Sequence, residues 1–244
     1  MSTDEPMHLV AHLRELRDRF RNALIALFIA FVSLFPFANE LYTYVSEPLR
    51  SLLPEGSSMI ATEVTSPFLT PFKLSLVLAV FVAMPVILAQ LWGFIAPGLY
   101  KSEKRIAIPL LTSSVILFYA GVAFAYYVVF PLLFGFFTTV GPGDISVMTD
   151  INRYLDFVLK LFFAFGLAFE VPVAAVILIL TGVVTADQLA NNRSYVIVGC
   201  FVMGMLLTPP DVISQALLAV PMWLLFEVGL VMGRALSRSP NDDE

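Results

Sequence analysis

Six long apolar segments alternate with polar or Pro- and Gly-rich segments along this chain of 244 residues. A helix needs about 20 mostly apolar residues to cross a hydrocarbon core about 30 Å thick. The pattern therefore predicts an all-α integral membrane protein with six transmembrane helices in a single membrane domain. The predicted spans lie near residues 22–38, 73–95, 108–132, 155–180, 194–208 and 212–232. Residues 1–21 are expected to precede this 22–232 core as an amphipathic N-terminal segment, and residues 233–244 to follow it as a tail.

The fifth and sixth segments are predicted to form a short hairpin. Tyr195 to Leu207 is only 13 residues long. At 1.5 Å per residue such a helix spans about 20 Å, which is less than the hydrocarbon core. The connection "TPPD" holds two consecutive prolines, which lack a backbone N–H and do not continue a helix. We expect a tight turn at the outer face and a thinned membrane beside it.

The composition supports the membrane assignment. Hydrophobic residues make up 59% of the chain and charged residues only 14%, whereas about one-quarter of a soluble domain is charged. The mean hydropathy is +0.86. The acidic N-terminus does not have the layout of a cleaved signal peptide, so we expect it to be retained.

The basic residues predict the orientation. Four lie on the segments that would face one side: Arg50, Lys73, Arg153 and Lys160. The other ten of the 14 lie in 1–21, in the 96–107 and 182–193 loops, and in the tail. Because cytoplasmic segments carry the excess of Lys and Arg, both termini are predicted to be cytoplasmic. Lys160 lies about one turn inside the fourth span, near enough to the outer face to snorkel there.

The N-terminal segment "HLVAHLRELRDRFR" is amphipathic. Its apolar residues are spaced by four, three and four positions, which places them on one helix face: Leu9, Leu13, Leu16 and Phe20. We expect an interfacial helix that lies before the first span. Glu15 stands among four arginines on its polar side. Glu15 either pairs with Arg19 four residues later, or accepts a guanidinium from a ligand.

A second acidic residue of the same face is Glu103, in "LYKSEKR". It lies just before the third span, where a carboxylate is favoured by the helix dipole and neutralises the neighbouring cations. Alternatively, Glu15 and Glu103 each accept one guanidinium in a bidentate fork, so that a ligand with adjacent arginines fits the pair.

Glu170, in "FAFGLAFEVPVAAV", is the most unusual residue of the membrane region. A charged side chain in the centre of a bilayer costs at least a few kcal/mol, so it needs a partner, water or a proton. Pro172 removes a helix hydrogen bond near Ala168 and is expected to bend the helix there. Glu170 either joins two helices of this chain or faces a cavity or a partner. Glu227 is expected to reach the cytoplasmic interface.

Catalytic chemistry is not supported. The two histidines, His8 and His12, both lie in the N-terminal segment, away from any candidate nucleophile. The sequence contains no HExxH zinc motif and no Cys/His or Ser/His pair within the membrane. We therefore expect no enzyme, no metal and no cofactor. The remaining classes are a binding protein and a secondary transporter that uses Glu170 as its proton or cation site.

Six blocks of the sequence resemble one family. They are "HLRELRDR", "SPFLTPFK", "QLWGFIAPGLYKSEKR", "FAFGLAFEVPV", "LTPPDVISQ" and "PMWLLFEVG", and they run in order from about residue 8 to residue 234. The chain resembles TatC, the multi-span receptor of the twin-arginine protein translocase. The resemblance implies a cupped six-helix bundle in the bacterial cytoplasmic (inner) membrane, which binds twin-arginine signal peptides of folded proteins at the cytoplasmic face.

The resemblance also implies partners. These are the single-span proteins TatA and TatB, further copies of the receptor in the same complex, and no nucleic acid. The proton-motive force would drive translocation, and the complex would hydrolyse no nucleotide.

The residue roles that the resemblance implies fall into four groups. Glu15 and Glu103 match the carboxylates that bind the two arginines, and Arg17 and Phe94 match the same surface. Glu170 matches a buried acid on the concave side. A polar patch that contacts partner helices is matched by Met205, Thr208 and Gln215, and the outer cap by Pro48. Lys160 has no counterpart role, and the single basic residue of the 182–193 loop departs from the more basic loops of relatives.

Overall fold

A computed structural model of the chain describes residues 5–50, 59–95, 104–140, 150–207 and 212–237. The regular structure of these residues is helical, with one isolated bridge between Ile60 and Asp150. Five helical stretches are long and apolar enough to cross a membrane: Leu13–Glu47, Ser66–Phe94, Ile108–Phe136, Ile151–Leu180 and Gln215–Leu236. A sixth, Arg193–Leu207, is apolar but shorter. The predicted six-helix bundle with a short fifth helix is confirmed.

The first span differs from the prediction. α1 (Glu5–Leu34) is one continuous helix, so the expectation of a separate interfacial helix before the first span is wrong. The reason is visible in the sequence, because no proline or glycine lies between Pro6 and Pro36 to end the helix. The 3₁₀ turn η1 (Phe35–Phe37) contains Pro36, and α2 (Ala38–Arg50) follows it where a polar connection was expected.

The remaining helices follow in order. α3 (Ser66–Ile95) is followed by α4 (Lys104–Phe124), the π-helical turn η3 (Ala125–Val129) and α5 (Phe130–Val140). α6 (Ile151–Ala168) and α7 (Val171–Leu180) form the fourth span. The short helix α8 (Ala186–Asn191) replaces part of the expected 182–193 loop, and α9 (Arg193–Leu207) and α10 (Val212–Ser237) complete the chain.

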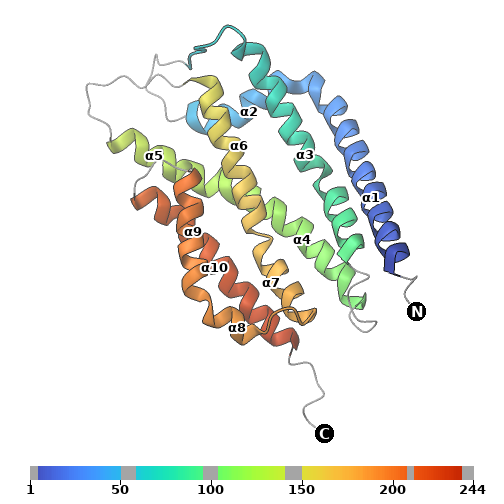
Figure 1. Cartoon of the computed structure of the whole chain (residues 1–244). Coiled ribbons are helices and arrows are strands. Elements are labelled where there is room, and N and C mark those ends of the chain that lie inside the picture. The colour runs from blue at the N-terminus through green and yellow to red at the C-terminus, as the bar shows by residue number, and fades with distance from the viewer. Residues whose placement is uncertain (1–4, 51–58, 96–103, 141–149, 208–211, 238–244) are drawn as a thin grey trace.

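The helices form a curved row in which α6 is central (Figure 1). α1 packs against α3, α6 against α4, and α10 against both α7 and α9. The start of α1 and the end of α10 lie at the same end of the molecule, as an even number of crossings requires (Figure 1). α1 and α9 therefore stand at opposite edges of the row.

Aromatic rings and glycines bring α4 and α6 close together. The rings of Phe81, Phe118 and Phe162 belong to one buried cluster. A Cβ at Gly166 would lie 2.6 Å from the Phe118 ring, and one at Gly121 would lie 2.4 Å from the Phe165 carbonyl oxygen. Small residues at such contacts let helix backbones approach in membranes, where van der Waals packing holds helices together. This close approach fixes the position of α6 and of Glu170 beyond it.

Asp150 joins the segment before α3 to the start of α6. Its Oδ1 accepts hydrogen bonds from the N–H groups of Asn152 (3.0 Å) and Arg153 (2.9 Å), which makes it the helix N-cap. Its Oδ2 accepts from the Thr62 hydroxyl (2.7 Å) and the Thr62 N–H (3.0 Å). The Ile151 N–H donates to the Ile60 carbonyl at 2.9 Å. One carboxylate thus holds two segments that lie far apart in the sequence.

These hydrogen bonds predict an acid-dependent stability. The Arg153 N–H first, and then the Thr62 and Asn152 donors, lower the pKa of Asp150 to about 2. A lowered pKa stabilises the fold above the unfolded value of about 4, and this contribution is lost as the pH falls from about 4 to about 2. Thermal unfolding should therefore show the wild type losing its advantage over Asp150→Asn across this range. A difference that does not change with pH would contradict the assignment.

Candidate functional site

Two acids of the predicted binding surfaces have described side chains, Glu15 on α1 and Glu170 between α6 and α7. Glu103 and Thr208 lie outside the described residues, so the structure does not place them. Pro48 lies within α2.

Glu15 holds a guanidinium with one of its two oxygens. The Arg19 Nε and Nη2 donate to Glu15 Oε1 at 2.9 and 2.5 Å. The Glu15 side chain is 38% exposed and the Arg19 side chain is 27% exposed. The intrahelical pair that the sequence left open is therefore present. Glu15 Oε2 accepts no hydrogen bond from the described part of the chain, although an ionised carboxylate has about four acceptor positions.

Arg19 reaches from α1 to the last turns of α3. A Cβ at Gly93 would lie 2.0 Å from Arg19 Nη1. Only a residue without a side chain leaves this space for the guanidinium. Phe94, which is half-buried, follows Gly93 directly. The structure therefore brings the Glu15 pair and the predicted residue Phe94 to one region, at the end of α3 that lies beside the start of the first span.

Arg17 points to a different partner. Its Nη2 lies 3.0 Å from Asp18 Oδ1, and its side chain is 68% exposed. Arg21 Nη1 lies 3.3 Å from the same Asp18 oxygen. Arg17 is thus near Glu15 in the sequence and on the same helix, but it does not bind the Glu15 carboxylate.

Glu170 lies at a break in the fourth span. The Glu170 N–H donates to the Leu167 carbonyl at 3.0 Å, three residues back rather than four, and α7 begins at Val171. Pro172 has no N–H to donate to Ala168, so the predicted interruption of the helix is confirmed. A Cβ at Gly229 would lie 2.6 Å from the Pro172 Cα, which shows that α10 packs closely on the first turn of α7.

The two oxygens of Glu170 have different surroundings. The hydroxyl of Ser114, a buried residue of α4, donates a hydrogen bond to Oε2. Oε1 is buried and has no hydrogen-bond partner in the described part of the chain. A buried polar atom without a partner costs about 1–3 kcal/mol. Glu170 therefore joins two helices of this chain, as one alternative expected, and also keeps an acceptor open.

Met205 lies in the last turn of α9 and Gln215 in the first turn of α10, away from Glu170. The Met205 side chain is 51% exposed. The α9 backbone at Gly204 approaches α10 at Gln215, since a Cβ there would lie 3.2 Å from the Gln215 carbonyl oxygen. Gln215 is 14 residues before Gly229, which corresponds to about 21 Å along α10. The predicted partner-binding residues therefore form two separate sites along the helices, one at Glu170 and one at Met205 and Gln215.

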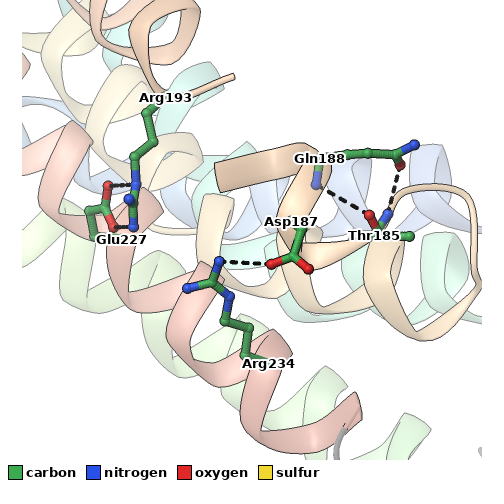
Figure 2. A network of polar contacts seen from close by, with 6 residues as sticks. All are labelled: Thr185, Asp187, Gln188, Arg193, Glu227 and Arg234. Carbon is green, nitrogen blue, oxygen red and sulfur yellow. Dashed lines mark hydrogen bonds and ion pairs between the residues drawn. The ribbon is translucent and has the colours of Figure 1, made fainter. Parts of the chain in front are cut away.

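Basic residues at the opposite end of α9 and α10 form contacts within the chain (Figure 2). Arg193 binds Glu227 with two hydrogen-bonding nitrogens, Nε at 2.7 Å and Nη2 at 2.8 Å. Arg234 Nη2 lies 3.1 Å from Asp187 Oδ1 of α8. Thr185 and Gln188 cap α8 reciprocally. Glu227 was expected to reach the cytoplasmic interface, and its ion pair with Arg193 was not predicted.

Three residues that matter to these sites were not identified from the sequence. Gly93 and Ser114 acquire their roles only when α3 meets α1 and α4 meets α6, and nothing in their local sequence indicates these contacts. Asp150 precedes an apolar helix, so its role as N-cap was visible as a sequence signal.

No group of three or more His, Cys, Asp or Glu that is suited to a metal occurs among the described residues.

Comparison with known proteins places these features in a family. A family described as Sec-independent protein translocase protein (TatC) matches residues 11–221. The TatC protein of Azotobacter chroococcum mcd 1 is 64% identical over 231 residues, which are 95% of this chain and 91% of that protein. The TatC protein of Escherichia coli K12 is 54% identical over 234 residues, 96% of this chain and 91% of that one.

A solved structure agrees with the sequence relatives. The crystal structure of a twin arginine translocase receptor, TatC, superposes with a TM-score of 0.83 at 40% identity, and the match covers 93% of this chain and all of that one. The sequence and the multi-pass helical fold thus agree on one family. The chain belongs to the TatC family of Sec-independent protein translocase proteins.

Proposed function

We propose that this protein is the signal-peptide receptor of a twin-arginine translocase in a bacterial inner membrane, with both termini in the cytoplasm. The observation that carries the proposal is the Glu15 carboxylate, which holds the Arg19 guanidinium with Oε1 while Oε2 has no partner among the described residues. A carboxylate arranged in this way accepts a second guanidinium without first releasing Arg19.

Arg19 then acts as a positioning residue. It is held between Glu15 and the backbone of α3 at Gly93, so it fixes the rotamer of the carboxylate at a side chain that is 38% exposed. A carboxylate that is held in place loses less conformational entropy when a ligand binds. The first arginine of a signal peptide would bind Glu15 Oε2, and Phe94 would contact the aliphatic part of the peptide beside it.

Glu103 would accept the second arginine of the pair. Two separate carboxylates, each taking one guanidinium, would recognise adjacent arginines. Glu103 would pair in a bidentate fork, whereas at Glu15 the ligand guanidinium would bind Oε2 alone because Arg19 occupies Oε1. Arg17, which is exposed and bound to Asp18, would remain on the rim of this surface and contact polar groups of the peptide.

Glu170 would bind a polar side chain on a transmembrane helix of a partner. Its Oε1 is buried without a hydrogen bond among the described residues, whereas Oε2 is satisfied by Ser114. Met205 and Gln215, with Thr208 between them in sequence, would form a second contact at the outer end of α9 and α10. The partners would be TatA and TatB, in a complex that holds several copies of this chain.

The receptor would break no covalent bond, and the proton-motive force would supply the energy of export. A secondary transporter with Glu170 as its proton site is the alternative, and membership of a protein-translocase family favours the receptor. Proton flux through liposomes that contain only the purified chain distinguishes the two functions, since a receptor subunit alone carries none.

The first prediction concerns the arginine-binding acids. Photocrosslinking of a twin-arginine signal peptide to the purified chain in membranes should be lost with Glu103→Ala and reduced at least tenfold with Glu15→Gln. The loss follows because a hydrogen bond to a charged group contributes about 1.5–3 kcal/mol. Asp187→Asn, which removes a carboxylate bound to Arg234, is the matched control and should bind normally. Wild-type crosslinking and export by Glu103→Ala would contradict the assignment.

The second prediction uses the space at Gly93. In Gly93→Ala the new Cβ would displace the Arg19 guanidinium, because the two groups would otherwise be 2.0 Å apart. Peptide binding should weaken, while thermal stability should not fall. An exposed ion pair contributes only about 0.2–1 kcal/mol, and replacing glycine by alanine within a helix gains a similar amount.

Gly199→Ala provides the control for this variant. Gly199 also lies within a helix, but a Cβ there meets nothing within 4 Å. It should gain the same helix propensity without changing peptide affinity. Equal peptide affinity in Gly93→Ala and Gly199→Ala would show that Arg19 does not position Glu15.

The third prediction separates two roles of Glu170. Glu170→Ala should lose the co-purified single-span partner, because the open acceptor Oε1 is removed. Ser114→Ala should keep the partner, since it removes only the internal donor to Oε2. Ser114→Ala should unfold at a lower temperature than the wild type, because it leaves the second Glu170 oxygen without a donor as well. If both complexes kept the same composition and export activity as the wild type, Glu170 would serve only to join α4 and α6.

A further inference from the structure

A cavity opens between three helices on the side of α6 where α3 and α9 lie. Its volume is about 410 Å³. Most of its walls are apolar and come from all three helices, for example Val77 of α3, Phe163 of α6 and Leu207 of α9. Three charged residues line the same cavity: Lys73, Asp156 and Lys160. The neighbouring cavity beside Cys200 and Phe226 has no charged residue in its lining.

The charges of this cavity do not balance. Lys73 Nζ donates to Asp156 Oδ1, which joins α3 to α6. Lys160 is exposed and has neither an ion pair nor a hydrogen bond with any residue that the structure describes. Asp156 and Lys160 are four residues apart on one helix, so Asp156 can reach either lysine. Whichever lysine it binds, one positive charge remains without an anion.

The depth of Lys160 places this charge near the membrane interface. The fourth span, Ile151–Leu180, has 30 residues, so it is about 45 Å long and extends beyond a 30 Å hydrocarbon core at both ends. Lys160 is the tenth residue of the span, about 13.5 Å from its start. Its Cα thus lies just within the hydrocarbon, and the long side chain reaches toward the head groups.

We propose that this cavity binds one anionic phospholipid, whose head-group phosphate pairs with Lys160 while an acyl chain lies along the apolar walls. The net charge of the three cavity residues is +1, which matches a lipid of charge −1. A zwitterionic lipid carries its own cation near its phosphate and therefore gains less from the unpaired ammonium. Basic pockets between transmembrane helices bind anionic head groups at the cytoplasmic or matrix side of membranes, and the same charge pairing is available to Lys160 at its own end of the fourth span.

The position of the charge favours a lipid over a protein helix. The unpaired Lys160 ammonium lies at the level of the head groups, where lipid phosphates are present. The rest of the lining from α3, α6 and α9 is apolar and suits an acyl chain. A carboxylate from a partner helix is the competing ion-pair partner of the Lys160 ammonium, and the experiment distinguishes it from a lipid phosphate.

The test compares two lipids on the purified full-length chain in neutral detergent. Phosphatidylglycerol and phosphatidylcholine with the same acyl chains are titrated, and bound lipid is counted by native mass spectrometry, with thermal unfolding as a second readout. The wild type should prefer phosphatidylglycerol. Lys160→Met, which keeps the length of the side chain, should lose about fivefold in this preference, because one basic residue near an anionic head group contributes about 1 kcal/mol.

Two further variants make the outcome decisive. Asp156→Asn raises the cavity charge to +2 and should strengthen the preference for phosphatidylglycerol, a gain that misfolding does not produce. Arg153→Gln removes an exposed charge from the same helix outside the cavity lining and should leave the preference unchanged. An unchanged preference in Lys160→Met overturns the proposal. So does a result in which Lys160→Met loses a co-purified membrane partner but binds both lipids as the wild type does.

Discussion

An oxygen atom of a carboxylate needs a hydrogen-bond donor wherever water is scarce, and this requirement organises the protein. Glu15 and Glu170 each receive a donor from the chain on one oxygen, from Arg19 and from Ser114. The second oxygen of each acid has no donor among the described residues. That of Glu170 is buried, whereas that of Glu15 belongs to a side chain that is 38% exposed and is open to water. Each acid is thus held in place and still able to accept a hydrogen bond from another chain, as the proposed receptor function requires.

Close helix contacts create the two positions. Gly93 leaves room for the Arg19 guanidinium at the end of α3, and Gly166 lets α6 approach the Phe118 ring of α4. On the other side of Glu170, Gly229 lets α10 pack against Pro172. Because hydrophobic burial does not drive helices together in lipid, such contacts and a few polar bonds hold the bundle. The geometry of the acids therefore depends on residues that carry no functional group.

Much of the fold was predictable because hydropathy, length and proline placement are local signals. They identified six spans, the short helix α9 and the interruption before Pro172. Amphipathicity misled the prediction for α1, where the lack of any helix breaker was the stronger signal. Glu15 and Glu170 were identified as unusual acids, but Gly93 and Ser114 were not. Their roles depend on contacts between helices distant in sequence, which no local pattern contains.

In the proposed receptor, Glu15 binds its own Arg19 and a ligand arginine at the same time. Solid-state NMR can measure this on the chain in lipid bilayers, with ¹³C-labelled glutamate carboxyl groups and a twin-arginine peptide whose guanidinium nitrogens are ¹⁵N-labelled. The account predicts dipolar contact between the Glu15 carboxyl carbon and a peptide guanidinium, while the contact with Arg19 persists. A Glu15 carboxyl that touches only Arg19 after peptide binding would contradict it.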